Sequence, residues 1–225
     1  MPSSVEFGKT VDAAPDGALD APAFHRNHDA IWSVLAPWLL TQTGNVLEAG
    51  SGTGQHVVEF AKQSPRLVWW PSDYNEAHVR SIDAWRLHSQ LPNIRPARRI
   101  DLSASDWGFG ADDSRLLRDL TAIFCANVVH IAPWNVAEGL LGHAAARLKP
   151  DGRLYMYGPF MRNGEHTAPS NAAFDASLRR QNPEWGVRDV ADLTAIAERS
   201  GLSLAETMPM PANNFILMFV RTSPA

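Results

Sequence analysis

A carboxylate and three alternating glycines stand at the end of one short apolar run. Glu48 lies in the run that begins at Asn45, and Gly50, Gly52 and Gly54 follow at every second position. Glycine lets the backbone turn sharply and approach a ligand closely, and the amino end of a following helix adds a partial positive charge. A strand that leads into such a turn and then into a helix is typical of a nucleotide-type site.

The spacing of the glycines separates two classes of ligand. A pyrophosphate-binding G-x-G-x-x-G motif needs a third glycine three residues after the second, and none follows Gly52 there. The carboxylate of Glu48 would repel a pyrophosphate, whereas it suits an ammonium or sulfonium charge. Asp73, 19 residues after Gly54, can accept hydrogen bonds from ribose hydroxyls. S-adenosylmethionine is cationic, contains a ribose and lacks a pyrophosphate, so it matches this set.

His130 is the candidate catalytic base. It follows Asn127-Val-Val at the predicted carboxyl edge of the sheet, where ligands bind in open α/β sheets. A neutral imidazole there could accept a proton from a hydroxyl, thiol or amine during methyl transfer. The alternative is that His130 only packs beside the cofactor. Asn127 is expected to contact the cofactor or the loop backbone.

Helical and strand-like patterns alternate along the chain and must position these residues. Apolar residues at helical spacing predict a helix near Val57 and others over residues 24–40, 75–90, 135–148 and 189–200. Short apolar runs predict strands over residues 45–49, 67–70, 96–100, 122–126, 154–157, 202–207 and 215–220. A turn is expected at 149–152, and 159–187 is expected to be a functional loop or lid because it is rich in Pro, Asn and Gly.

This alternation predicts an α/β fold with a doubly wound, mostly parallel, seven-stranded Rossmann-like sheet. The last two strands have no helix between them, so they should form an antiparallel C-terminal hairpin. Residues 1–22, rich in Ala, Pro, Asp, Gly and Ser, are expected to form a flexible arm before a single domain at 23–225.

The carboxylate, the alternating glycines and Asp73 together resemble the cofactor signature of class I S-adenosylmethionine-dependent methyltransferases. A narrower resemblance, to the methyltransferase-like 26 family (domain of unknown function 938), runs from about residue 24 to the C-terminus. The phrases that carry it are Gly52-x-Gly-Gln-His56, Trp70-Pro-Ser-Asp73, Tyr157-Gly-Pro-Phe160, Phe174-Asp-x-Ser-Leu-Arg179, Asn182-Pro-Glu-Trp-Gly186 and Met210-Pro-Ala-Asn-Asn214. The resemblance implies that 23–225 is a methyltransferase domain with an N-terminal lid helix.

The resemblance also implies which residues bind the cofactor. They are Glu48, Gly50, Ser51, Gly52, Gly54, His56, Asp73, Tyr74, Asp101, Leu102 and Asn127. Asp101 could accept a hydrogen bond from the adenine amino group. A helix cap is the alternative role, because Leu102-Ser103 follows it.

Polar residues interleaved with Trp and Pro in the second half of the chain suggest an acceptor pocket. The candidate substrate-binding residues are Arg26, Asn27, Trp134, Trp185, Arg188 and Asn213. Arg26 and Asn27 are expected on the lid helix, with a plain cap as the alternative. Arg188 could equally form a structural ion pair with Asp189.

Eight tryptophans against three tyrosines are a further clue. Five of them are expected in the core: Trp32, Trp38, Trp69, Trp70 and Trp85. Three fall in predicted loops at the carboxyl edge of the sheet: Trp107, Trp134 and Trp185. We expect at least one of these three to line the acceptor pocket, which would favour a flat or apolar acceptor.

Composition excludes several classes of partner. The 225 residues carry 20 Lys and Arg against 24 Asp and Glu, with no basic cluster and no Asn/Asp-Pro-Pro-Tyr/Phe phrase, so nucleic acid is not expected. No stretch approaches the roughly 18 apolar residues of a membrane span, and Met1–Asp20 has no signal-peptide core. His25, His28 and Asp29 lack further ligands for a metal. The single cysteine, Cys125, suggests a reducing, cytoplasmic setting.

The sequence therefore predicts an enzyme that transfers a methyl group from S-adenosylmethionine to the O, N or S atom of a small, possibly aromatic molecule. The protein would act as a monomer or homodimer. Two alternatives stay open: a non-catalytic S-adenosylmethionine-binding protein that acts through a protein partner, and an NAD-dependent oxidoreductase.

Overall fold

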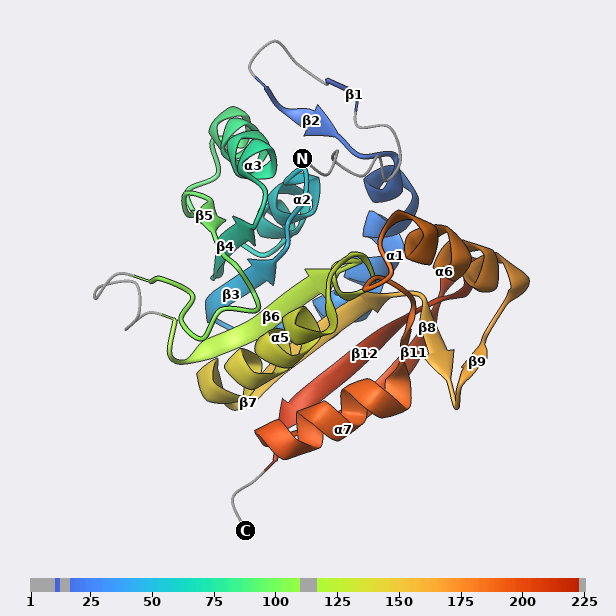
Figure 1. Ribbon diagram of the computed structural model, residues 1–225. Helices are drawn as coiled ribbons and strands as arrows, with labels where there is room; N and C mark the ends of the chain where they lie inside the picture. Colours follow the sequence, from blue (N-terminus) through green and yellow to red (C-terminus); the bar gives the residue numbers. More distant parts are fainter. Residues whose placement is uncertain (1–10, 13–16, 110–116, 223–225) are drawn as a thin grey trace.

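Buried strands form one central sheet in the computed structural model, which describes residues 11–12, 17–109 and 117–222 (Figure 1). In spatial order the seven strands are β11 (Leu202–Met210), β12 (Asn214–Arg221), β7 (Leu148–Gly158), β6 (Leu120–Ala126), β3 (Gly44–Ala49), β4 (Leu67–Asp73) and β5 (Arg98–Arg99). β12 is antiparallel to both of its neighbours, and the remaining pairs are parallel. The predicted seven-stranded sheet and C-terminal hairpin are confirmed.

Helices cover both faces of this sheet (Figure 1). One face carries α1 (Pro22–Leu39), α2 (Gln55–Gln63) and α3 (Glu76–Ser89). The other carries α5 (Trp134–Arg147), which follows the short helix η1 (Val129–Ile131), and α7 (Val190–Ser200). The two layers place the carboxyl ends of β3, β4 and β6 beside the amino ends of the helices that follow them, which is where the chemistry-bearing residues lie.

Side chains of consecutive residues in one strand pack on opposite faces of the sheet. Val46 and Trp69 pack with the cluster under α1 and α2, whereas Leu47 and Trp70 pack with the cluster under α5 and α7. Because both faces are covered, these strands need apolar side chains at consecutive positions. The adjacent tryptophans of β4 therefore pack under helices on opposite faces, as expected.

The other tryptophans predicted in the core differ in burial. Trp32 is buried, but Trp38 and Trp85 are only half-buried. The guanidinium of Arg153 lies 4.4 Å from the ring centroid of Trp38, and the indole N–H of Trp85 donates to the Leu19 carbonyl at 2.8 Å. These two rings thus anchor polar groups at the edge of the core.

Trp107 lies in a loop, as expected, but it does not face solvent there. It is buried in the core under α5, with its ring 4.2 Å from that of His143. A large apolar ring gains more from packing against a helix than from lining an open edge.

The expectation of a long loop over residues 159–187 is wrong. This segment contains β8 (Phe160–Arg162), β9 (Glu165–His166) and α6 (Pro169–Gln181), and β8 also pairs with β10 (Arg188–Asp189). Pro169 suggested a loop, but it stands in the first turn of α6, where a helix tolerates proline because that backbone N–H has no intrahelical partner.

The described part of the predicted arm is not loose. Leu19–Asp20 (β2) pairs with Val11–Asp12 (β1), and Ala18 is buried. Residues 1–10 and 13–16 of that arm lie outside the described residues. The turn expected at 149–152 falls at a register shift near the start of β7. Leu120 of β6 pairs with Leu148 of β7, and the next paired residues are Ala122 and Arg153, so β7 has extra residues at this point.

No described helix combines the length and the apolar character that crossing a membrane requires.

Candidate functional site

The glycine loop connects β3 to α2 at the carboxyl edge of the sheet. Gly50, Gly52 and Gly54 have φ values of 75°, 58° and 94°, a region that strongly favours glycine. A Cβ at Gly50 would lie 2.3 Å from the Val128 side chain, and one at Gly54 would lie 2.7 Å from the Ile82 Cα. A Cβ at Gly52 would meet nothing within 4 Å. Packing therefore requires the outer glycines, whereas the middle one faces open space.

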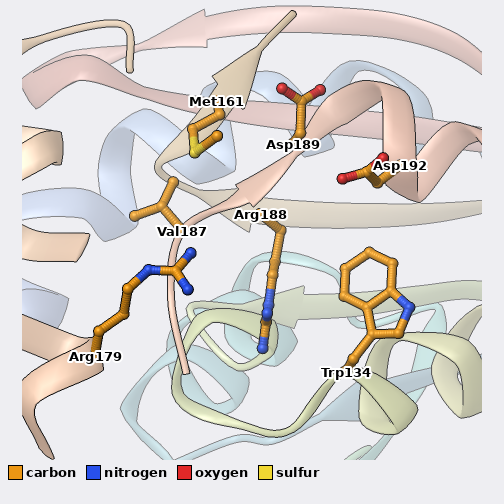
Figure 2. Close-up of a pocket in the computed structure, with 7 residues that line it drawn as sticks. All are labelled: Trp134, Met161, Arg179, Val187, Arg188, Asp189 and Asp192. Atoms are coloured by element: carbon orange, nitrogen blue, oxygen red, sulfur yellow. The ribbon is translucent and has the colours of Figure 1, made fainter. Parts of the chain in front are cut away.

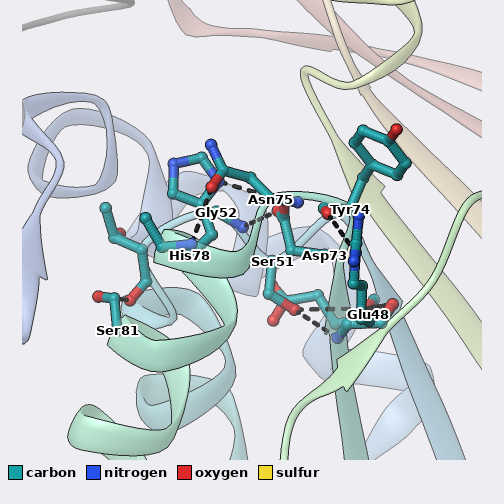
Figure 3. Close-up of polar contacts among 12 residues, drawn as sticks. Glu48, Ser51, Gly52, Asp73, Tyr74, Asn75, His78 and Ser81 are labelled. Carbon is teal, nitrogen blue, oxygen red and sulfur yellow. Dashed lines mark hydrogen bonds and ion pairs between the residues drawn. The ribbon is translucent and has the colours of Figure 1, made fainter. Parts of the chain in front are cut away.

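Asp73, at the end of β4, fixes this loop (Figure 3). One carboxylate oxygen accepts the Gly52 N–H at 2.9 Å, and the other accepts the Asn75 N–H at 2.9 Å. The latter oxygen also lies 3.2 Å from His78 Nδ1, and this hydrogen bond raises the pKa of His78. The acidic residue that ends the next strand is thus held directly against the middle glycine.

Glu48 is buried at the end of β3, below the loop (Figure 3). Its Oε2 atom is buried and has no hydrogen-bond partner in the described structure. The pKa of the carboxyl is raised to about 8: burial is the largest cause, a hydrogen bond with Ser51 opposes it, and the charge of Asp73 adds to it. The empty protein therefore keeps Glu48 largely protonated at neutral pH. A buried carboxyl oxygen without a partner is costly, and a cation beside it would supply one.

The other residues predicted to bind the cofactor lie around the same edge. Tyr74 is exposed, and the Arg99 guanidinium lies 5.5 Å from its ring centroid. Leu102 is buried. Asp101 accepts hydrogen bonds from the Ser103 N–H at 2.9 Å and the Ser103 hydroxyl at 2.6 Å, so one of its oxygens stabilises a local turn. No helix begins in the described residues 102–109, so these contacts do not cap one.

Asn127 and His130 meet at Gly158, the last residue of β7. Asn127 has a φ of 58°, and a Cβ at Gly158 would lie 3.3 Å from its Oδ1 and 2.5 Å from His130 Nε2. Gly158 thus makes room for both side chains. The structure brings together these two residues, which sequence reasoning had linked only by their spacing.

His130 is 1% exposed, and its ring packs against Phe160 with centroids 4.9 Å apart. Burial and the charge of Arg188 lower its pKa to about 3, so the imidazole is neutral. The Arg188 backbone N–H donates to Nδ1 at 3.4 Å, which places the ring proton on Nε2. Nε2 has no partner among the described atoms. This tautomer offers a donor rather than a lone pair, so the predicted base role requires the imidazole to change its hydrogen bonding.

The Arg188 side chain binds backbone carbonyls in and near η1 and in the segment that precedes β10. Its guanidinium donates to the carbonyls of Val129 at 2.9 Å, Ala132 at 2.6 Å and Glu184 at 2.8 Å. Asp189 does not need this guanidinium, because its carboxylate accepts backbone N–H groups of Gly164 and Ala191 and caps α7. The alternative of an Arg188–Asp189 ion pair is therefore wrong, and the backbone binding explains why the guanidinium is held in place.

A cavity of about 190 Å³ lies beside Arg188 (Figure 2). Two of the predicted substrate-binding residues, Trp134 and Arg188, line it, and the guanidinium lies 5.3 Å from the Trp134 ring centroid. Trp134 is thus the one of the three edge tryptophans that faces this cavity. None of its lining residues belongs to the glycine loop, and they are Trp134, Met161, Arg179, Val187, Arg188, Asp189 and Asp192.

The remaining predicted residues divide between α1 and the far hairpin. Asn27 is buried on α1 with Oδ1 2.9 Å from His56 Nε2, while Arg26 beside it is exposed. Asn213 is exposed between β11 and β12, and its carbonyl accepts an Asn171 side-chain N–H at 2.9 Å. Trp185 is half-buried. The predicted substrate residues therefore belong to separate contact networks.

Sequence reasoning missed three residues near these networks. Gln55 and Ser81 connect the glycine loop to the N-terminal segment, and Tyr157 on β7 is buried next to α1. Burial raises the pKa of Tyr157, while hydrogen bonding with Asn27 and the charge of Arg26 lower it. Gln55 and Tyr157 stood inside the phrases that carried the family resemblance, but contacts with residues so distant in sequence could not be inferred from them.

Several solved methyltransferase structures share this fold. An O-methyltransferase family protein from Burkholderia thailandensis matches with a TM-score of 0.73 at 15% identity, over 90% of this chain and 58% of that one. The mitomycin 7-O-methyltransferase matches with a TM-score of 0.69 at 17% identity, over 88% and 54%. The O-methyltransferase of neocarzinostatin biosynthesis, solved with S-adenosylmethionine and 2-hydroxy-5-methyl naphthoic acid, matches with a TM-score of 0.67 at 15% identity, over 88% and 55%.

This chain spans little more than half the length of those three proteins, and at such identities the likeness shows the fold alone. A family model described as "Protein of unknown function (DUF938)" matches residues 19–221. This match confirms the domain 938 part of the predicted resemblance, while the narrower methyltransferase-like 26 name stays a prediction. The chain belongs to the DUF938 family.

Proposed function

We propose that this protein transfers a methyl group from S-adenosylmethionine to a small-molecule acceptor. The observation that carries the proposal is the buried carboxyl of Glu48, whose Oε2 has no hydrogen-bond partner in the described structure, beneath a glycine loop whose middle residue faces open space. A cationic ligand that lies over Gly52 would give this carboxyl a partner. The methyltransferase fold of the solved structures supports the same reading.

The residues present fit S-adenosylmethionine. Gly52 leaves room for close approach, and Asp73, whose side chain is 12% exposed, lies against that glycine, where its carboxylate could also accept hydrogen bonds from ribose hydroxyls. Glu48 would balance the positive charge of the ligand. When bound, S-adenosylmethionine supplies an electrophilic methyl group on a sulfonium.

The protein would contribute mainly by positioning. The glycine loop and Asp73 hold the donor side, while the residues around Asn127 and His130 border the acceptor side of the same sheet edge. Aligning the two reactants and excluding water can remove roughly 7–11 kcal/mol of barrier. His130, neutral and buried, would orient the acceptor by donating from Nε2, or accept its proton after shifting its own hydrogen bonds.

A flat acceptor is favoured by two observations. Trp134 lines the cavity beside Arg188, and one structurally similar enzyme was solved with a naphthoic acid. The acceptor atom would be O, N or S. The other possibility, binding without catalysis, differs from this proposal only in turnover.

Calorimetry with S-adenosylmethionine and S-adenosylhomocysteine tests cofactor binding. We expect both to bind the parent chain and Asp73→Ala to lose most of the affinity. Because Asp83 is an acidic residue of α3 that pairs with Arg86 instead, Asp83→Ala serves as the control. If the parent chain binds neither ligand, the proposal is wrong. If NAD(H) binds and quenches tryptophan fluorescence and S-adenosylhomocysteine does not, the oxidoreductase alternative is favoured.

Turnover separates an enzyme from a binding protein. The parent chain, a methyl-labelled donor and a library of aromatic hydroxyl, amine and thiol compounds should yield at least one labelled product. Cofactor binding together with no product from any class would favour the non-catalytic alternative.

A further inference from the structure

Residues 17–28, here called the N-terminal strap, run from β2 into the first turns of α1 beside the glycine loop (Figure 1). The two residues that directly follow Gly54, Gln55 and His56, both hydrogen-bond to this strap. Neither contact is needed to build the sheet, and the mechanism described above uses neither.

The side chain of Gln55 is buried and joins three groups. Its Oε1 accepts the Ala21 N–H at 2.7 Å and the Thr53 hydroxyl at 2.9 Å, while its Nε2 donates to Asp20 Oδ1 at 2.7 Å. The orientation of the amide is determined, because a backbone N–H can only donate and an ionised carboxylate can only accept. Gln55 therefore links the strap to Thr53 inside the glycine loop.

A second connection runs through α3. The Ser81 hydroxyl donates to the Thr53 carbonyl at 2.7 Å and accepts the Leu19 N–H at 2.8 Å. The Trp85 indole N–H donates to the Leu19 carbonyl at 2.8 Å. Both backbone groups of Leu19 are thus satisfied by side chains of α3, and Ser81 bridges the strap to the same loop residue that Gln55 holds.

The far end of the strap is held by His56. Its Nε2 lies 2.9 Å from Asn27 Oδ1, and burial with the charge of His28 lowers its pKa to about 3, so the neutral ring donates to the amide oxygen. The Phe24 ring packs edge-on against His56 with centroids 5.2 Å apart. Release of the strap would leave Gln55, Ser81 and His56 with unpaired polar groups next to the loop.

We propose that the N-terminal strap and the glycine loop form one cooperative unit and that Gln55 is the positioning residue that couples them. Departure of the strap removes the partners that orient Gln55, and Thr53 then loses the acceptor of its hydroxyl. The loop and the strap should therefore loosen together. Because coupling is reciprocal, a ligand that orders the loop should also hold the strap.

Hydrogen exchange on the full chain without ligand tests this unit. In Gln55→Glu, a carboxylate replaces the amide donor that binds Asp20, so two like charges face each other where a hydrogen bond stood. We expect exchange to rise roughly tenfold both in the strap and in residues 50–54, the effect of losing one or two such bonds. Circular dichroism and Tm verify that each variant remains folded.

The chain offers a matched control and a rescue. Gln63→Glu makes the same change on the same helix, where Gln63 donates to Glu59 at an exposed site, and should alter neither segment. The double variant Asp20→Asn/Gln55→Glu reverses donor and acceptor and should restore slow exchange. Asp20→Asn alone is measured as well, because Asp20 also contacts His25.

The outcomes decide the proposal. Faster exchange in the strap with an unchanged loop would show two independent elements, and unchanged exchange in both would show that Gln55 couples nothing. Failure of the double variant to restore slow exchange would assign the effect to something other than this hydrogen bond. Each of these three results overturns the proposal.

A binding measurement extends the test and rests on the proposed function. Gln55→Glu should weaken S-adenosylhomocysteine binding roughly tenfold, and the double variant should recover it. Normal affinity in a variant whose strap and loop both exchange fast would overturn the positioning role. If the parent chain binds no S-adenosylhomocysteine, the proposed function fails, while the exchange experiment still decides whether the strap and loop are one unit.

Discussion

At the scale of single residues, the buried carboxyl of Glu48 and the buried imidazole of His130 define the edge of the sheet. Both are neutral at pH 7 for the same reason, since burial penalises the charged form of each. They differ in what a ligand would do to them. A cation near Glu48 would favour its ionised form. At His130, burial and the charge of Arg188 outweigh the backbone hydrogen bond with Gly186 and the charge of Asp175, which favour a charged ring.

Glu48→Gln should weaken S-adenosylmethionine binding by at least roughly tenfold and S-adenosylhomocysteine binding much less, because only the former carries a sulfonium charge. Calorimetry with both ligands measures the difference. Glu59→Gln, at the exposed site that binds Gln63, is the control. Equal losses of affinity for the two ligands would mean that Glu48 does not interact with the sulfonium charge.

The pH dependence of binding follows from the same group. The carboxyl of the empty protein has a pKa of about 8, and a bound cation would require the carboxylate. The affinity for S-adenosylmethionine should therefore rise as the pH increases toward 8 and level off above it, and Glu48→Gln should remove this rise. In the empty protein the raised pKa costs stability as the pH rises from 4.5 to about 8, so Glu48→Gln should raise Tm at pH 8.5.

His130 should make the free energy of unfolding depend on pH below neutrality. Its pKa falls from 6.5 to about 3 on folding, so the unfolded chain binds a proton that the folded chain does not, and stability is lost as the pH falls below 6.5. His130→Gln should reduce this loss by about 1.4 kcal/mol per pH unit between roughly pH 4 and 6. Urea unfolding at several pH values measures it, with exposed His88→Gln as control. An unchanged slope would contradict the buried, neutral state.

At the scale of elements, packing restricts two positions of the loop, Gly50 and Gly54, to glycine, whereas Gly52 faces open space. Gly54→Ala should destabilise the fold by more than roughly 2 kcal/mol, since its Cβ would lie 2.7 Å from the Ile82 backbone at a φ of 94°. Gly52→Ala should cost only about 1–2 kcal/mol of backbone strain, yet abolish S-adenosylhomocysteine binding because its Cβ enters the open space. Urea unfolding and calorimetry separate the two effects. Full binding by Gly52→Ala would place the ligand elsewhere.

The segment after β7 shows how an element can mislead a sequence argument. Pro, Asn and Gly over residues 159–187 have the composition of a loop, but Pro169 starts α6 and the small strands β8 and β10 pair across it. The pairing partner of β8 lies more than 20 residues further along the chain. Local composition carries no information about such a partner.

At the scale of the whole molecule, the sheet divides the core into two clusters, and the proposed ligand would sit at their common edge. A ligand that binds only the folded state should stabilise all of it. S-adenosylhomocysteine at 100 times its Kd should add about 2.7 kcal/mol and raise Tm by roughly 5–10 °C in a chain of this size. Scanning calorimetry measures the shift, and NAD is the control. If NAD raises Tm and S-adenosylhomocysteine does not, the result contradicts the proposed function.

The sequence determined the order of the strands along the chain, the closing hairpin and the glycine turn with Asp73, because these depend on local patterns: apolar runs, turn residues and glycine conformation. Glu48 and His130 could be singled out for the same reason. Only the tertiary structure decided that Oε2 of Glu48 lacks a hydrogen-bond partner, that Arg188 binds backbone carbonyls and that Gln55 links the strap to the loop. Burial and hydrogen bonding between distant residues arise when the sheet and helices pack, and no local pattern records them.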